Sequence, residues 1–154
     1  MANIWILAAD RARARLFSLD RDAPRLIEIA DFVNPQARTL GHEREHAPPT
    51  RVHDRFGEGR HAIEAHTSPR EKAALQFSAI LGSHLKHAHE EQRYRELVLV
   101  APPGFLGMLN AALGARLGGT VLLRVSKNLT RSPANEIREA LPHGLFKRRA
   151  SVNG

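Results

Sequence analysis

One stretch of the chain, residues 97–109 with the sequence LVLVAPPGFLGML, most constrains the fold. It begins with four consecutive apolar residues, Leu97–Val100, half of them β-branched, which is typical of a strand buried on both faces. Two prolines and a glycine then prevent further strand pairing. Apolar residues next recur at helical spacing over 105–117, and a glycine pair ends the segment. The stretch therefore predicts a strand, a turn and a helix within an α/β domain.

The residues before this stretch predict three antiparallel strands joined by short turns. Residues 3–9, 13–19 and 26–33 are strand-like runs separated by polar turn residues. In the first run, apolar side chains alternate onto both faces, so we expect that strand near the centre of the sheet. Residues 34–67 show no periodicity and are rich in proline, glycine and histidine, which predicts a long loop.

The remaining segments complete a mixed sheet. Ser68 and Pro69 are typical of a helix start, and an apolar stripe predicts a helix from there to residue 91 or 92. Such a helical crossover makes the strand at 97–100 parallel to the first strand. A last strand at 120–125 and a short helix near 133–140 follow. We therefore predict an α/β fold with a ribonuclease-H-like mixed five-stranded sheet, in the spatial order 3-2-1-4-5.

Length and composition predict a single domain over residues 1–142, followed by a basic C-terminal tail over 143–154. The 154 residues suffice for one hydrophobic core, and the absence of cysteine excludes disulfides and thiol chemistry. No apolar run approaches the ~20 residues of a membrane-spanning helix. The first residues lack the pattern of a secretion signal. We expect a cytoplasmic protein without membrane insertion.

The positive charge of the chain is concentrated toward its C-terminus. The net charge is +7, and residues 97–154 carry eight basic side chains but only two acidic ones. A basic surface of this kind is typical either of ordinary solvated charge or of a phosphate-binding patch. The candidate nucleic-acid-binding residues are Arg60, Arg116, Arg124, Lys127, Arg131, Lys147, Arg148 and Arg149.

Four short motifs, in order along the chain, resemble one bacterial family. They are AADRARARLF from residue 8, GRHAIE from residue 59, LVLVAPPGFLG from residue 97 and KNLT from residue 127. The chain is similar over nearly its whole length to the proteins required for attachment to host cells. That family in turn resembles the middle domain of archaeal and eukaryotic peptide-chain release factors. The resemblance implies the mixed sheet and a connection to RNA or the ribosome.

The release-factor likeness does not extend to its catalytic loop. That domain depends on a Gly-Gly-Gln loop, and the nearest stretch here, residues 57–61, has no glutamine. The family usually has an arginine after Pro-Pro and an aspartate before Leu129, where this chain has Gly104 and Asn128. The resemblance therefore favours a module without catalytic residues and without a cofactor.

Individual residues predict two further kinds of site. Eight of the nine histidines lie between residues 42 and 89, and His84 and His87 are one helical turn apart, which makes them weak candidates for a metal site. Polar residues at the predicted strand ends are candidates for a small-ligand or phosphoester site. They are Asp10, Arg60, His61, Pro102, Pro103, Gly104, Asn128 and Thr130.

Three functions follow from these patterns. The first is a non-catalytic RNA- or ribosome-associated module that uses the basic surface. The second is a protein-interaction module that affects attachment indirectly, through a protein partner. The third is the small-ligand site at the strand ends. A ribonuclease-H-type nuclease is disfavoured, because such an enzyme needs several carboxylates at the strand ends and no acidic residue follows the strands at 97–100 and 120–125.

Overall fold

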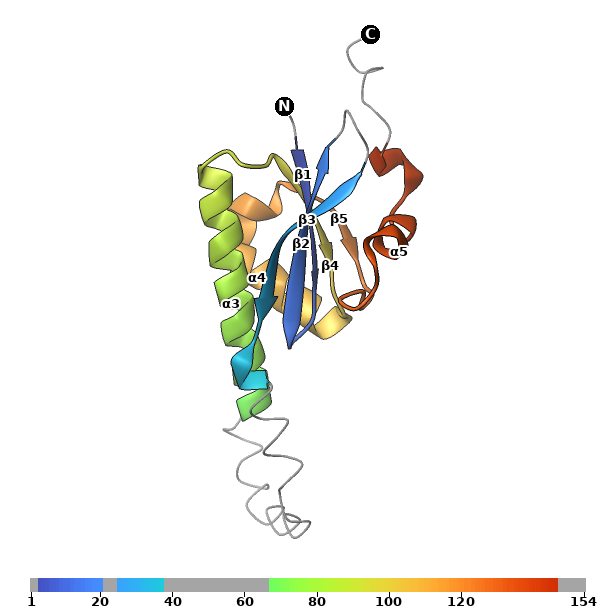
Figure 1. Ribbon diagram of the computed structural model, residues 1–154. Helices are drawn as coiled ribbons and strands as arrows, with labels where there is room; N and C mark the ends of the chain where they lie inside the picture. Colours follow the sequence, from blue (N-terminus) through green and yellow to red (C-terminus); the bar gives the residue numbers. More distant parts are fainter. Residues whose placement is uncertain (1–2, 21–24, 38–66, 147–154) are drawn as a thin grey trace, which may run out of the picture.

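The computed structural model describes residues 3–20, 25–37 and 67–146, which form one α/β unit (Figure 1). Its sheet has five strands in the order β3-β2-β1-β4-β5. Their bounds are β1 Asn3–Ala9, β2 Arg13–Asp20, β3 Leu26–Val33, β4 Glu96–Val100 and β5 Val121–Val125. β1 pairs antiparallel with β2 and parallel with β4. The predicted strand order and directions are confirmed.

Helices cover both faces of this sheet. α3 (Pro69–Glu90) and α4 (Pro103–Gly118) lie on one face, and the short α5 (Ala134–Glu139) lies on the other (Figure 1). β1 separates two hydrophobic clusters, with Trp5 and Leu7 in the cluster under α3 and α4 and Ile4 and Ile6 in the cluster under α5. The apolar character of both faces of β1 thus places it at the centre of the sheet, as predicted from the sequence.

The ends of the helices follow from local sequence. Ser68 caps α3, because its Oγ accepts a hydrogen bond from the backbone N–H of Glu71 at 3.1 Å. α4 differs from the uniform helix that its apolar spacing predicts. Gly114 has a φ of 79° and breaks the helix before its last turn. Only glycine adopts this conformation without a steric penalty, so the break is specified by the sequence.

Residues 143–146, which the sequence assigns to the C-terminal tail, form the 3-10 turn η2 (His143–Phe146). Leu145 packs there against the cluster under α5. Within the part of the chain that the structure describes, no helix is both long and apolar enough to cross a membrane.

α3 and α4 approach each other closely at Gly82. A Cβ atom added there would lie 3.0 Å from the Cβ of Ala112 and 3.2 Å from its carbonyl oxygen. Both atoms belong to Ala112 in α4, and one of them is a backbone atom, so the helices must separate to accept a larger side chain. The absence of a side chain at residue 82 therefore sets the distance between the two helices.

Replacement of Gly82 by alanine is expected to lower the free energy of unfolding by about 1–2 kcal/mol, because overpacking outweighs the gain in helix propensity. Gly107 is the matched control, since it lies in α4 and an added Cβ there meets nothing within 4 Å. Gly107→Ala should stabilise the protein by about 0.5–1 kcal/mol. Urea denaturation followed by circular dichroism measures both changes. Equal effects of the two substitutions would contradict the close packing at Gly82.

Candidate functional site

The carboxyl ends of β1, β4 and β5 meet at one end of the sheet, which we call the carboxyl edge. Asp10 directly follows β1 there and joins two loops. Its Oδ1 accepts hydrogen bonds from the backbone N–H groups of Ala12 (2.8 Å) and Arg13 (2.9 Å), which closes the turn from β1 to β2. Its Oδ2 accepts from Asn128 Nδ2 at 3.2 Å and from Thr130 Oγ1 at 3.0 Å. Both carboxylate oxygens are therefore occupied by structural contacts.

The loop between β5 and α5 is ordered by these contacts and by its own. Asn128 Oδ1 accepts a hydrogen bond from the backbone N–H of Thr130 at 3.1 Å, an Asx turn. Thr130 is buried, whereas its neighbours Lys127 and Arg131 are exposed. The loop thus presents two cationic side chains from a backbone that is fixed to the end of β1.

Arg15 in β2 connects this loop to the edge strand β3. Its guanidinium forms a bidentate pair with Glu28, at 3.1 Å from Nε to Oε2 and 2.9 Å from Nη2 to Oε1. Its Nη1 donates to the carbonyl oxygens of Thr130 (3.3 Å) and Ser132 (2.6 Å). The same guanidinium lies 5.1 Å from the centre of the Phe17 ring. One half-buried side chain thereby joins β2, β3 and the loop before α5.

The carboxyl groups beside Arg15 differ in their affinity for protons. The hydrogen bond from Arg15, reinforced by one from Asp31, lowers the pKa of Glu28 from 4.5 to about 2. The pKa of Asp31 is raised, because Asp31 interacts with the adjacent Glu28 carboxylate and is partly desolvated. The ionised form of Glu28 is therefore favoured, whereas the ionised form of Asp31 is disfavoured.

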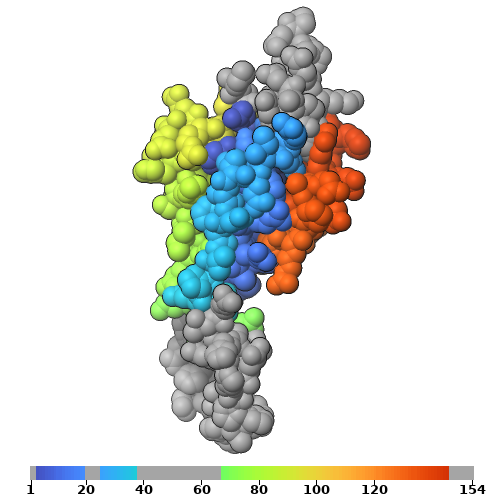
Figure 2. Space-filling model, viewed as in Figure 1, coloured from blue at the N-terminus to red at the C-terminus, as the bar shows by residue number. Residues whose placement is uncertain are grey.

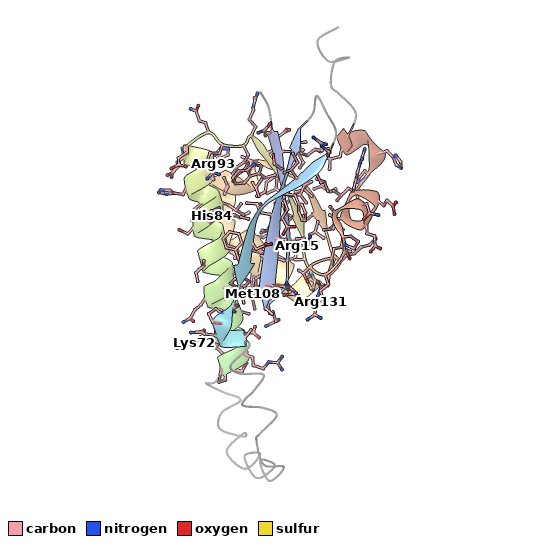
Figure 3. All side chains as sticks on the ribbon, viewed as in Figure 1. Arg15, Lys72, His84, Arg93, Met108 and Arg131 are labelled. Carbon is pink, nitrogen blue, oxygen red and sulfur yellow. The ribbon has the colours of Figure 1, made fainter. Side chains whose placement is uncertain are left out.

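A hollow of about 450 Å³ opens beside this ion pair, on the face of β2 and β3 that also bears α5. Its charged lining comes from β2, β3 and the loop before α5, and its remaining lining is mostly apolar. The lining residues are Arg13, Ala14, Arg15, Glu28, Asp31, Phe32, Val33, Thr130 and Arg131. Figure 3 shows Arg131 at the same end of the molecule as Lys72 near the start of α3.

The start of α4 lies at the same edge. Pro102 and Pro103 begin the helix, and no side chain caps its first N–H groups. The guanidinium of Arg11 crosses this end, because a Cβ added to Gly104 would lie 3.3 Å from Arg11 Nη2. Arg11 also pairs with Glu71 at 3.9 Å, and both of these side chains are nearly half exposed. Such an exposed pair contributes little to stability and leaves the arginine accessible.

The structure separates the predicted basic residues. Lys127 and Arg131 lie at the carboxyl edge, but Arg116 lies in the last turn of α4, at the opposite end of that helix. Arg124 in β5 donates from Nε to Asn110 Oδ1 at 2.7 Å, and so faces α4. Arg60, His61, Lys147, Arg148 and Arg149 lie outside the described residues.

The structure adds two basic residues to the carboxyl edge that the sequence had not indicated. Arg11 and Arg13 flank the turn from β1 to β2, and both are exposed. The signal for them was the turn itself, because an antiparallel hairpin after a central strand brings its turn to the edge where the parallel strands end. Together with Lys127 and Arg131 they define what we call the basic edge.

The two histidines weakly assigned to a metal lie on α3. His84 contacts the Phe32 ring edge-on, with ring centres 5.1 Å apart. Burial, followed by the nearby charge of Arg93, lowers the pKa of His84. Within the described residues, no three histidine, aspartate or glutamate side chains gather in a group that could hold a metal ion. The contacts of His84 are those of a packing residue between α3 and β3.

Two solved structures are similar to this chain at low sequence identity. Among solved structures, the chain is similar to the Ppx/GppA phosphatase of Aquifex aeolicus in its type II variant, with 10% identity, a TM-score of 0.44, and coverage of 82% of this chain and 36% of that one. It is also similar to the archaeal translation termination factor aRF1, with 15% identity, a TM-score of 0.46, and coverage of 98% of this chain and 38% of that one. The chain thus spans well under half the length of either structure.

A search of curated protein sequences returns no match. A family model does match, and it covers residues 5–141, from within β1 to the residues just after α5. That span includes the Asp10 turn, the start of α4 and the loop that bears Lys127 and Arg131. The chain therefore belongs to the family of proteins required for attachment to host cells.

Proposed function

We propose that this protein binds RNA through phosphate contacts at the basic edge. The observation that carries the proposal is the convergence of Arg11, Arg13, Lys127 and Arg131, all exposed, from two loops that Asp10 ties together. Cationic side chains held on a fixed backbone bind a line of phosphates at low entropic cost. No described carboxylate lies within ion-pair distance of Lys127 or Arg131.

The surroundings of the basic edge favour recognition of backbone and shape over stacking of bases. Among the aromatic side chains that the structure describes, every phenylalanine, tyrosine and tryptophan is buried or half-buried. Stacking platforms for successive bases are exposed aromatic rings, so this edge lacks them in its described part. Both oxygens of Asp10 accept hydrogen bonds from the two loops, which supports a structural rather than a catalytic role for this residue.

The test measures RNA binding across a series of salt concentrations, for the wild type and for a variant in which three cationic side chains are replaced by glutamine. Compared with the wild type, the variant Arg13→Gln, Lys127→Gln, Arg131→Gln is expected to bind a fluorescent single-stranded RNA about tenfold or more weakly. This difference applies at salt concentrations between about 50 and 200 mM. The variant's slope of log affinity against log salt should fall by about 2, at roughly 0.7 per lost phosphate contact. Fluorescence anisotropy measures both quantities.

The matched control removes the same charge from the opposite end of the sheet. Lys86, Arg95 and Arg116 are exposed, and they lie near the end of α3, the start of β4 and the end of α4. Their triple glutamine variant should keep the affinity within about twofold and most of the salt slope, since long-range charge is screened. Equal losses of RNA affinity in the two variants would show that binding depends on net charge alone, and would overturn the assignment to the basic edge. Co-sedimentation with ribosomes across the same salt series then tests whether ribosomal RNA is a partner.

A further inference from the structure

The hollow beside Arg15 combines charges that the phosphate contacts alone do not explain. Arg13 and Arg131 are exposed cations of its lining, and Glu28 and Asp31 are carboxyl groups of the same lining. A site for phosphate alone gains nothing from carboxylates, which repel it. A site for a cation gains nothing from the two arginines. The lining therefore fits a ligand with an anionic part and, beside it, a neutral part that donates hydrogen bonds.

Among the carboxyl groups of the lining, Asp31 is the one without an arginine or lysine partner in the described part of the chain. Both oxygens of Glu28 are occupied by Arg15, at 3.1 and 2.9 Å. Asp31 lies opposite Arg15 in the strand register, but it forms no ion pair within 4.0 Å with a described arginine or lysine. A pair of N–H donors brought to Asp31 would stabilise its ionised form, which the neighbouring Glu28 makes unfavourable.

The size of the hollow and the exposed apolar side chain of Val33 fit a nucleobase. Its volume of about 450 Å³ is in the usual range for small-ligand sites. Val33 lines it and is 61% exposed, so it offers an apolar surface to the face of a planar ring. Guanidinium groups such as those of Arg13 and Arg131 also stack on bases. Figure 2 shows β3, in light blue, exposed between the yellow-green α3 and the orange-red C-terminal segments, so the strand is accessible from solvent.

Among the four bases, guanine alone presents two adjacent N–H donors on one edge, at N1 and at the N2 amino group. A carboxylate accepts from both at once, whereas cytosine, adenine and uracil each offer it a single donor group. We propose that this hollow binds a guanine nucleotide, with Asp31 accepting from N1–H and N2–H and with Arg13 and Arg131 holding the adjoining phosphate. The guanine is one nucleotide of the bound RNA, so this inference rests on the proposed function.

The test compares two fluorescent RNA nonamers on the full chain, one of uridine only and one with a single central guanosine. The guanosine nonamer is expected to bind about tenfold more tightly, as one bidentate base contact provides. Asp31→Asn should abolish this preference and leave the affinity for the uridine nonamer unchanged or slightly higher. Glu90→Gln, which removes an exposed carboxylate at the end of α3, is the control for charge and should keep the preference.

The outcomes separate this inference from the proposed function. If neither nonamer binds, the proposed function fails. If both bind equally, or if Asp31→Asn keeps the preference, only the guanine site is overturned. Competition with free GMP and UMP identifies the source of the nucleotide. Displacement by GMP but not UMP assigns the hollow to guanine nucleotides in general, and resistance to both with the preference intact assigns it to guanine within RNA. Equal displacement by GMP and UMP contradicts the proposal.

Discussion

Replacement of Arg15 by methionine is expected to lower the free energy of unfolding by about 2–3 kcal/mol at neutral pH. The substitution keeps most of the apolar side chain but removes the bidentate pair with Glu28 and the hydrogen bonds to the carbonyl oxygens of Thr130 and Ser132. Glu28, whose side chain is 33% exposed, then remains charged and partly desolvated without its partner. Urea denaturation monitored by circular dichroism measures the loss.

Two variants separate the ion pair from the packing. Glu28→Gln keeps a hydrogen-bond acceptor for Arg15. It should therefore lower the free energy of unfolding by less than Arg15→Met does, by about 1 kcal/mol. The double variant Arg15→Met, Glu28→Met removes both charges, and its loss should be smaller than the sum of the single losses, since no unpaired charge is left. Additive losses would contradict a direct Arg15–Glu28 interaction.

The pH dependence of stability should report the same pair. Because the folded pKa of Glu28 is lowered from 4.5 to about 2, its stabilising contribution is complete above pH 4.5 and is lost as the pH falls toward 2. The difference in stability between wild type and Arg15→Met should therefore shrink by about 1–2 kcal/mol across this window, after allowance for solvent screening at a partly exposed site. Asp31, with a raised pKa, acts in the opposite direction: its contribution is present at low pH and is lost as the pH rises.

The strand order was predictable because it depends on patterns that are local in sequence. The buried runs at 3–9 and 97–100, joined through a capped helix, leave a parallel pairing of the two central strands as the simplest arrangement. The connection lengths then place the remaining strands outside them. Each of these signals lies within a few residues of the element that it specifies, and all of them point to the same topology.

The contacts of Arg15 were not predictable from the same patterns. The structure shows Arg15 half-buried against β3, and no pattern in the β2 sequence indicates this contact. A register shift between Leu16 and Phe17 leaves Ile29 without a partner and brings Glu28 opposite Phe17. Nothing in the spacing of apolar residues indicates where one extra residue enters an edge strand. The ion pair follows from that bulge, so it becomes visible only in three dimensions.

The site at the carboxyl edge was predictable in part. The expectation that polar residues gather beyond the strand ends grouped Asp10, Asn128 and Thr130, and the structure joins these three residues by hydrogen bonds. Their contacts span separations of 118 and 120 residues, and no sequence pattern specifies which of them bind one another. Arg116 was grouped with Lys127 because the two lie close in sequence, but the length of α4 and β5 places them at opposite ends.

Replacement of Asp10 by alanine is expected to destabilise the protein by about 2–3 kcal/mol and to release the loop before α5. The carboxylate accepts four hydrogen bonds from two loops, and hydrogen bonds to a charged acceptor contribute more than neutral ones. Thr130 is buried, so its hydroxyl would keep only Asn128 as a partner. Thermal and urea unfolding measure the loss, and amide exchange of residues 126–132 measures the release of the loop.

Asp10→Asn is the matched control, because it preserves one of the two acceptors. The asparagine oxygen still accepts from the N–H groups of Ala12 and Arg13, but its amide nitrogen cannot accept from Asn128. The loss of stability in Asp10→Asn should therefore be about half that in Asp10→Ala. Amide hydrogen exchange should increase in residues 126–132 and stay unchanged in the turn from β1 to β2. If RNA binding depends on the positions of Lys127 and Arg131, both variants should weaken it in the order of their effects on the loop. A loss of binding with an undisturbed loop would instead place Asp10 in direct contact with the ligand and would contradict the structural role assigned to it.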